Sequence, residues 1–277
     1  MILPRRFIPG GIPPIPVWPN LDQFTHVHSY SLTSSAGETG LDIDQTDGTA
    51  FYYTRGSASG VRECTMTGWD ISTVSGCLTN TAMATDLRCV RWNRDDGTSV
   101  WVTQDAGLTV NVIKYAAGTP WSLTGITSGD ATTKDITSDL ASPNTRGLFM
   151  RPGGLELWLT DGGTNTYRYT MSAYDPSTLV LASTYTSMPQ ANDLYFSPDG
   201  MRYYTAIGTS PNATIKQWNL TSAYDLSTIP GTADYTLNVS AQVGGSPGNP
   251  YGLTFRPSGT DLYMLSWPNR EVHRYSA

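Results

Sequence analysis

The sequence predicts an all-β fold built from repeated four-stranded antiparallel sheets, and three observations support this prediction. Charged residues make up only 14% of the 277-residue chain, which contains 27 glycines and 18 prolines. This composition indicates frequent turns and argues against a helical bundle, a coiled coil or a charge-rich disordered chain. An aromatic-Asp-x-Ser-Thr block recurs about every 50 residues, and strands with alternating polarity flank it.

The recurring block, which we call the pinned turn, is the clearest element of the repeat. It occurs at 68–73 (GWDIST), 173–178 (AYDPST) and 223–228 (AYDLST), with a degenerate copy at 120–124 (PWSLT). The aromatic positions 69, 121, 174 and 224 are 52, 53 and 50 residues apart. The Asp and Ser side chains can close local turns by bonding to nearby backbone N–H groups. We therefore expect each aromatic ring to pin its loop to the sheet.

Two further elements repeat together with the pinned turn. The first is a tight turn in which glycine supplies a positive φ, and it ends at Gly48, Gly97, Gly154, Gly200 and Gly259. The second is an alternating strand that ends in an aromatic residue, at 113–115, 167–169, 215–218 and 272–275. One unit is therefore strand, tight turn, strand, strand, pinned turn, strand. This order is typical of a β-propeller blade.

The number of tight turns predicts five blades and a ring that is closed by the N-terminal part of the chain. The fifth unit ends after its third strand, and segment 28–34 lines up with 234–240, the fourth strand of the preceding unit. We therefore expect strand 25–34 to pair with 271–275 as the outer strand of the last blade, which leaves no open sheet edge. The propeller would span 25–277. A six-bladed ring with a degenerate blade within 125–145 is the alternative.

Residues 1–24 are predicted to form an extended, proline-rich anchoring arm. Six prolines favour polyproline II conformations, and the apolar side chains between them suit burial better than a solvated linker. The candidate partner-binding residues are Ile2, Leu3, Arg5, Arg6, Phe7, Ile8, Ile12, Ile15, Val17 and Trp18. We expect this arm to dock on a partner protein. The alternative is that it folds back on its own propeller.

Charge and cysteine usage limit the partners and the compartment. A net charge of −6 with three lysines argues against a nucleic-acid-binding surface. No apolar run approaches the roughly 18 residues that a membrane span needs, and the first residues lack the pattern of a signal peptide. The three cysteines, Cys64, Cys77 and Cys89, form no CxxC pair, so we expect reduced thiols in a protein made in the cytoplasm.

Patterns that could carry catalysis are weak. Segment 244–248 (GGSPG) fits the letters of G-x-S-x-G, and Asp261 and His273 follow in the order found in hydrolases. No helical period follows this segment, and Pro247 removes a backbone N–H that an oxyanion hole would need. We therefore interpret the match as a chance feature of a Gly/Ser/Pro-rich loop and predict no catalytic residue.

Patterns that could hold a metal ion are also weak. Segment 42–48 (DIDQTDG) resembles a calcium loop, but its spacing is one residue off and it lacks the closing Glu, so we expect a hairpin turn. His26 and His28 would share one face of a strand, and ring closure would bring His273 near them. No fourth ligand for a zinc-like ion is evident. We therefore predict no metal site and no cofactor.

The combination of FSPDG (196–200), a Tyr-rich strand and QWNLTSAYDLST (217–228) resembles propeller repeats in structural proteins of tailed bacteriophages. The resemblance covers roughly 25–277 and is strongest over 145–277. The first two blades depart from it, since 94–97 lacks the proline and 64–67 lacks the usual aromatic. The resemblance implies a non-enzymatic virion protein on the capsid or tail, a decoration or an appendage that aids host attachment.

In that role the arm would bind other virion proteins, and a host surface glycan is a further candidate partner. Related Ser-Pro-Asp-Gly propellers also occur in bacterial lactonase-like and surface proteins. The alternative function is therefore a soluble bacterial module that binds carbohydrate or acts as a lactonase-like hydrolase. No catalytic residue of such enzymes can be matched in this sequence.

Overall fold

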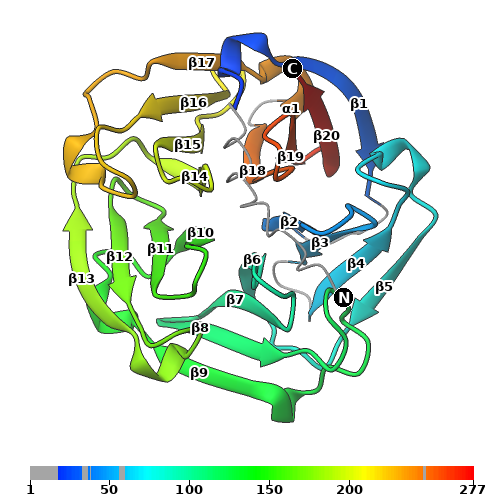
Figure 1. Cartoon of the computed structure of the whole chain (residues 1–277), viewed down its shortest axis with the longest axis vertical. Coiled ribbons are helices and arrows are strands. Elements are labelled where there is room, and N and C mark those ends of the chain that lie inside the picture. Colours follow the sequence, from blue (N-terminus) through cyan, green and yellow to red (C-terminus); the bar gives the residue numbers. More distant parts are fainter. Residues whose placement is uncertain (1–17, 33–36, 38, 56–59, 246–247) are drawn as a thin grey trace, which may run out of the picture.

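The structure is a computed structural model that describes residues 18–32, 37, 39–55, 60–245 and 248–277. In this part of the chain, twenty strands form five four-stranded antiparallel sheets, arranged as the blades of a ring (Figure 1). The five-bladed propeller predicted from the repeat is therefore confirmed. Segment 125–145 holds no extra blade, because it supplies the outer strand of blade 2 between two short 3-10 turns.

The strands of each blade are given from the axis outward. Blade 1 comprises β2 (Leu41–Ile43), β3 (Ala50–Thr54), β4 (Val61–Thr65) and β5 (Gly76–Asn80). Blade 2 comprises β6 (Leu87–Trp92), β7 (Ser99–Ala106), β8 (Thr109–Ala116) and β9 (Ala131–Asp135). Blade 3 comprises β10 (Thr145–Met150), β11 (Glu156–Asp161), β12 (Thr166–Thr170) and β13 (Val180–Tyr185). Blade 4 comprises β14 (Ala191–Phe196), β15 (Arg202–Ile207), β16 (Thr214–Asn219) and β17 (Tyr235–Asn238). Blade 5 comprises β18 (Asn249–Phe255), β19 (Asp261–Trp267), β20 (Glu271–Ser276) and β1 (Thr25–Ser31).

The helical segments of the described residues are short. Six are 3-10 turns: η1 (Leu21–Gln23), η2 (Ile71–Thr73), η3 (Ser128–Asp130), η4 (Thr137–Asp139), η5 (Pro176–Thr178) and η6 (Leu226–Thr228). One is a single α-helical turn, α1 (Ser240–Val243). No helix in this part of the chain is long and apolar enough to cross a membrane.

The pinned turns have the geometry expected from their residues. The carboxylates of Asp70, Asp175 and Asp225 accept the backbone N–H of the Ser two residues later, at 2.9–3.0 Å, which starts η2, η5 and η6. The preceding aromatic adopts a positive φ, 66° at Trp69, and its ring covers the tight-turn glycine of the same blade. A Cβ on Gly48 would lie 2.2 Å from the Trp69 ring, so glycine is needed there for space as well as for backbone conformation.

The ring closes as predicted, because β1 pairs with β20 and becomes the outer strand of blade 5 (Figure 1). The described residues 18–24, which are part of the predicted arm 1–24, pack on the ring, where η1 lies against β16 and β17 of blade 4. Trp18 is 6% exposed, and its ring covers Gly259 as the other aromatics cover their glycines. Trp18 is therefore the fifth pinning aromatic.

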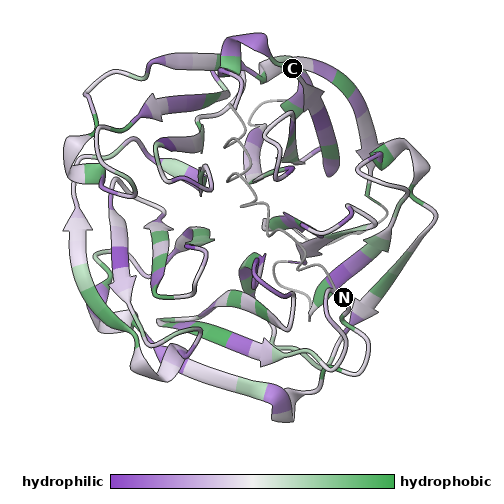
Figure 2. Ribbon diagram, viewed as in Figure 1, coloured by the Kyte–Doolittle hydropathy of each residue, from purple (hydrophilic) through white to green (hydrophobic). Residues whose placement is uncertain are grey.

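The core lies between the blades, and hydrophobic and hydrophilic residues alternate along them (Figure 2). The predicted set of three reduced thiols is wrong, since Cys64 on β4 and Cys77 on β5 form a disulfide. These residues are direct partners in the antiparallel register, with Cα atoms 4.1 Å apart. Cys89 is free and buried, and burial raises the pKa of its thiol, which leaves it unreactive.

Candidate functional site

The five innermost strands bring one residue each to an equivalent position at the axis, five or six residues before the turn glycine. These residues are Asp42, Arg91, Phe149, Tyr195 and Thr254. Two residues before this position, three blades have a glycine, and there the neighbouring inner strands come close together: Gly40, Gly147 and Gly252. A Cβ on Gly147, for example, would lie 2.9 Å from the backbone nitrogen of Leu194. Blade 4 differs, because Asp193 places a carboxylate at this position.

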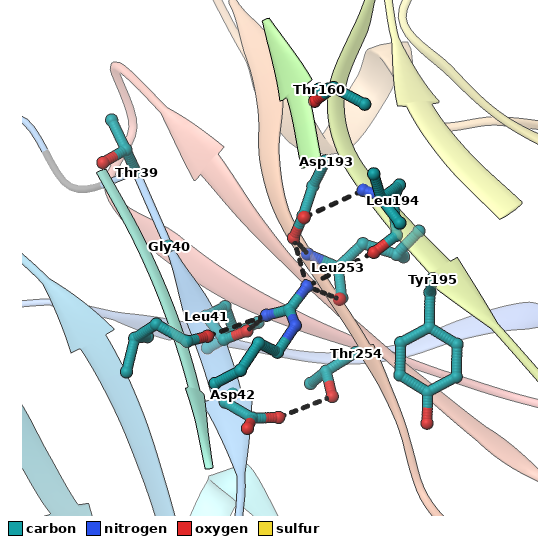
Figure 3. Close-up of polar contacts among 12 residues, drawn as sticks. Thr39, Gly40, Leu41, Asp42, Thr160, Asp193, Leu194, Tyr195, Leu253 and Thr254 are labelled. Carbon is teal, nitrogen blue, oxygen red and sulfur yellow. Dashed lines mark hydrogen bonds and ion pairs between the residues drawn. The ribbon is translucent and has the colours of Figure 1, made fainter. Parts of the chain in front are cut away.

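Arg91 joins the inner strands of four blades. Its side chain is 1% exposed and donates to the carbonyl oxygen of Leu41 in blade 1 and, at 3.0 Å, to that of Leu253 in blade 5. It also donates to the Asp193 carboxylate at 2.8 Å and to the Leu194 carbonyl at 3.4 Å, both in blade 4. Figure 3 shows these acceptors converging on one point. The charged group thus ties the ring together instead of facing solvent.

The Asp193 carboxylate is equally enclosed. Besides Arg91, it accepts the backbone N–H of Leu253 at 2.7 Å and that of Leu194 at 2.8 Å. Burial raises the pKa of Asp193, and the Arg91 guanidinium opposes that rise. All of these partners lie within the inner strands. We therefore assign Arg91 and Asp193 to a structural lock on the axis.

A second ion pair lies beside this lock. Arg94 donates to the Asp42 carboxylate at 3.2 Å and to the Tyr195 hydroxyl at 3.0 Å, with its guanidinium 4.8 Å from the centroid of the Tyr195 ring. Asp42 also accepts the backbone N–H of Trp92 at 2.8 Å and the Thr254 hydroxyl at 3.1 Å. The Arg94 guanidinium is therefore already paired within the protein.

A pocket of about 210 Å³, the axial pocket, contains Arg94 and Tyr195 in its wall. Its wall takes residues from the tight-turn region of every blade, among them Gln45, Arg94, Pro152, Pro198 and Pro257. Its other lining residues are Asp95, Phe149, Tyr195 and Phe196. The volume is below the roughly 300–1,000 Å³ of most small-molecule sites. The axial pocket therefore suits one apolar side chain or ring better than a whole metabolite.

The ionisable groups of the axial pocket are already engaged within the protein. Asp95 accepts the Tyr174 hydroxyl at 2.6 Å and the backbone N–H of Gly153 at 2.9 Å. Arg94 is held by Asp42 and Tyr195, as described above. A general acid or base must reach a proton of the substrate. The Asp95 and Arg94 side chains instead form hydrogen bonds with residues of neighbouring blades. The arrangement supports binding and rigidity more than proton transfer.

Two of the three histidines come together, since the His26 and His273 ring centroids are 5.7 Å apart, but His28 does not join them. A β-bulge between His26 and His28 shifts the register, so that His28 lies opposite Arg274 and Ser29 lies opposite His273. The Ser29 hydroxyl bonds to His273 Nδ1 at 2.7 Å and to His26 Nε2 at 3.0 Å. Within the described ranges, no group of three or more His, Cys, Asp or Glu side chains is arranged to hold a metal ion.

The remaining sequence patterns have structural roles. In the calcium-like segment, Asp44 and Asp47 accept backbone N–H groups of their own hairpin at 2.8 and 3.0 Å. Ser246 of the G-x-S-x-G match lies outside the described residues. The other members of that match are engaged elsewhere, since Asp261 pairs with Arg256 and Arg274, and His273 Nε2 bonds to the Ser266 hydroxyl at 2.9 Å.

Of the ten arm residues predicted to bind a partner, nine lie outside the described residues: Ile2, Leu3, Arg5, Arg6, Phe7, Ile8, Ile12, Ile15 and Val17. The tenth, Trp18, packs on the propeller near Tyr195, with ring centroids 6.0 Å apart. The sequence interpretation also missed Arg91 and Asp193. The available signal was their position, because a charged residue in an otherwise apolar inner strand requires a buried partner.

Comparisons with known proteins support the fold. No family model matches the chain, and neither does any curated protein. Among solved structures, the chain is similar to the β-propeller domain of Cps50 (Swd1) from Myceliophteria thermophila, with 10% identity and a TM-score of 0.51, over 92% of this chain and 99% of that domain. A Bacteroides uniformis protein assigned as a 6-phosphogluconolactonase matches at 16% identity and a TM-score of 0.47, over 86% of this chain and 66% of that one. A Bacteroides fragilis protein with the same assignment matches at 13% identity and a TM-score of 0.44, over 82% of this chain and 76% of that one. These likenesses concern the propeller fold alone.

Proposed function

We propose that this propeller is a non-enzymatic structural module of a tailed-phage virion, displayed on the capsid or tail and held there by the residues that precede Trp18. One observation carries the anchoring role. Blade 5 is complete once β1 supplies its outer strand and Trp18 covers Gly259. The ring is therefore complete without residues 1–17, and we assign their apolar side chains to a partner.

The axis supports a display role over catalysis. Arg91, Asp193, Asp42 and Arg94 bond to one another, to backbone groups and to neighbouring side chains of the inner strands. Such a lock makes a rigid platform, and rigidity suits a domain that presents its loops. The virion assignment itself is motivated by the resemblance of the FSPDG and YDLST repeats to those of phage structural proteins.

The test is a rebinding experiment with particles of the encoding phage from which this chain has been removed. The full chain should bind these particles, whereas a variant lacking residues 1–17 should not. The deletion must stop at residue 17, because loss of Trp18 would unfold blade 5 and confuse anchoring with folding. Both proteins should show the same unfolding free energy.

A matched pair of substitutions sharpens the experiment. Ile12→Asp should weaken rebinding at least tenfold, since it places a charge in the apolar arm, while an Arg5→Ala control should have a smaller effect. Equal rebinding by the full chain and the deletion variant would contradict anchoring by the arm. Absence of the chain from intact particles would overturn the virion role and favour the soluble module.

A further inference from the structure

The junctions between blades follow a common rule. At four of them, a side chain of one blade donates to the backbone carbonyl of the pinning aromatic in the next blade. The Tyr263 hydroxyl donates to the backbone carbonyl of Trp69 at 2.6 Å, and Lys114 Nζ donates to the backbone carbonyl of Tyr174 at 2.8 Å. The other two donor and acceptor pairs are Tyr52 with Trp121 and Arg202 with Trp18.

The junction between blades 3 and 4 breaks this rule. Trp158 occupies the position that Tyr52 and Tyr263 hold in their blades, and its ring has no hydroxyl to offer. Arg168 lies opposite Trp158 as Lys114 lies opposite Trp101, but it turns to Glu156 of its own blade. No side chain in the described part of the chain donates to the Tyr224 carbonyl. The buried Trp158 Nε1 also lacks a hydrogen-bond partner there.

A hollow of about 430 Å³ opens at this junction, and we call it the blade 3/4 groove. Its lining includes Arg151, Glu156, Arg168, Tyr185, Tyr224 and Asp225. It adjoins a second hollow of about 570 Å³, which shares Tyr185 and Ser227 with it. Each volume falls within the roughly 300–1,000 Å³ typical of small-molecule sites. The groove is therefore large enough for a ligand of several polar groups.

The charges in the groove balance. Glu156 accepts from Arg151 at 3.1 Å and from Arg168 Nε at 3.1 Å, and the two arginine side chains are 43% and 32% exposed. Asp225 uses one carboxylate oxygen to accept the Ser227 N–H at 2.9 Å. Two cations thus face two anions, so a charged ligand of either sign gains little net attraction. A neutral ligand with paired donors and acceptors fits this lining best.

We propose that the blade 3/4 groove binds a neutral saccharide. Sugar hydroxyls both donate and accept, so they can donate to the Asp225 carboxylate and the Tyr224 carbonyl while accepting from the exposed edges of Arg151 and Arg168. Tyr185 supplies an aromatic face for the C–H side of a sugar ring, and its ring is held by stacking on Trp158 at 5.8 Å. The proposal does not depend on the anchoring role, since no residue before Trp18 contributes to it.

The test is saturation-transfer NMR on the full chain with maltose, cellobiose, lactose and N,N′-diacetylchitobiose as neutral probes. Glucuronic acid and methyl phosphate, whose C–H protons report the transfer, serve as anionic probes. We expect transfer to at least one neutral probe and none to methyl phosphate. A variant lacking residues 1–17 should give the same transfer, which separates this result from the outcome of the rebinding experiment.

Two variants locate the site, and the repeat supplies a matched control for each. Ala223→Trp fills the groove from an exposed position, while Ala173→Trp makes the same change in the pinned turn of blade 3, where Lys114 seals the junction. Asp225→Asn keeps an oxygen for the Ser227 N–H but removes the charge, and Asp175→Asn is its control. The groove variants should weaken saccharide binding at least tenfold, and the controls should leave it unchanged.

Three results would overturn the proposal. One is the absence of transfer to every neutral probe. Another is an equal loss of binding in Ala173→Trp and Ala223→Trp, which would place the site elsewhere. The third is binding of glucuronic acid and methyl phosphate in preference to the neutral sugars, which would show an anion site in place of a saccharide site.

Discussion

The axis and the blade 3/4 groove contain the same set of charges and use it differently. Each has two arginines and two carboxylates: Arg91, Arg94, Asp42 and Asp193 at the axis, and Arg151, Arg168, Glu156 and Asp225 in the groove. The axial arginine side chains are 1% and 10% exposed, whereas those of the groove are 43% and 32% exposed. Composition alone therefore does not distinguish a structural cluster from a candidate binding site.

The two regions differ in how completely each polar group is satisfied. Arg91 donates to carbonyls of blades 1, 4 and 5, and Asp193 is bonded by two backbone N–H groups. In the groove, among the described residues, the Tyr224 carbonyl has no side-chain donor, and the Asp225 carboxylate accepts only from Ser227 of its own turn. Buried and satisfied groups hold the ring together, while exposed and unsatisfied groups are left for a ligand.

Replacement of Arg91 by Met should give the largest loss of stability. It would leave Asp193 as an uncompensated buried charge and would remove the donor from carbonyls of three other blades, so we expect a loss of about 3–5 kcal/mol in the free energy of unfolding. Chemical denaturation would measure this loss. The double variant Arg91→Met/Asp193→Leu should recover most of it, because an apolar pair can replace a buried ion pair.

The matching change in the groove is Arg151→Met. This arginine is a partly exposed surface partner of Glu156, so its loss should cost less than about 1 kcal/mol. Equal losses in the two single variants would show that burial does not separate the two charge clusters, and the comparison would fail.

His273 is a buried titratable group outside the two clusters, and it tests whether burial of such a group makes the stability of the protein depend on pH. It lies on β20, bonds to Ser29 and Ser266, and is approached by His26 on β1 and by Glu271 at 3.8 Å. Burial lowers the pKa of His273 to about 3, from about 6.5 in an unfolded chain. The unfolded state therefore binds more protons between these values, and stability must fall as the pH drops below about 6.5.

The expected loss from this group between pH 7.5 and pH 5 is about 2 kcal/mol, at roughly 1.4 kcal/mol per pH unit below 6.5. Urea unfolding across this range should show that His273→Gln flattens the pH dependence relative to the unmodified chain. His28→Gln, on the other side of the bulge, is the control and should leave the slope unchanged. Identical slopes in all three proteins would rule out a buried neutral His273.

A further small effect concerns the residue that separates a sealed junction from the open one. Tyr263→Phe should cost about 1 kcal/mol, because it leaves the Trp69 carbonyl without its donor. The converse change, Trp158→Tyr, should place a hydroxyl near the Tyr224 carbonyl and weaken saccharide binding. Thermal unfolding and the NMR assay measure these two outcomes. Unaltered saccharide binding in Trp158→Tyr would show that the missing hydroxyl does not create the groove.

Much of the fold could be predicted because the repeat carries its own turn chemistry. The five tight-turn glycines gave the number of blades, and the Asp of each pinned turn gave its local hydrogen bond. Trp18 was missed because Pro19 separates it from Asn20, the N-cap of η1, whereas Trp69 is followed directly by Asp70, the N-cap of η2. One inserted residue was enough to hide the fifth copy.

The two polar clusters could not be predicted, for a different reason. Arg91 meets Leu41, Asp193 and Leu253, which lie in three other blades, and no local pattern encodes such a meeting. The Cys64–Cys77 disulfide likewise depends on the register of β4 and β5, which an odd cysteine count obscured. The groove depends on Trp158 at a position that is Tyr in three other blades, a difference whose meaning appears only when the junctions are compared.

The pairing of β1 with β20 also sets an order of assembly. Thr25 bonds to Ser276, which is 251 residues away along the chain, whereas the strands of blades 1 to 4 are each consecutive in sequence. Contacts between distant residues form slowly, because the intervening chain loses entropy before those contacts contribute. During synthesis, the first four blades can therefore form as they emerge, while the segment that contains Trp18 must wait for the last strands to be made. A circular permutant that joins this segment directly after β20 should fold faster than the natural chain order.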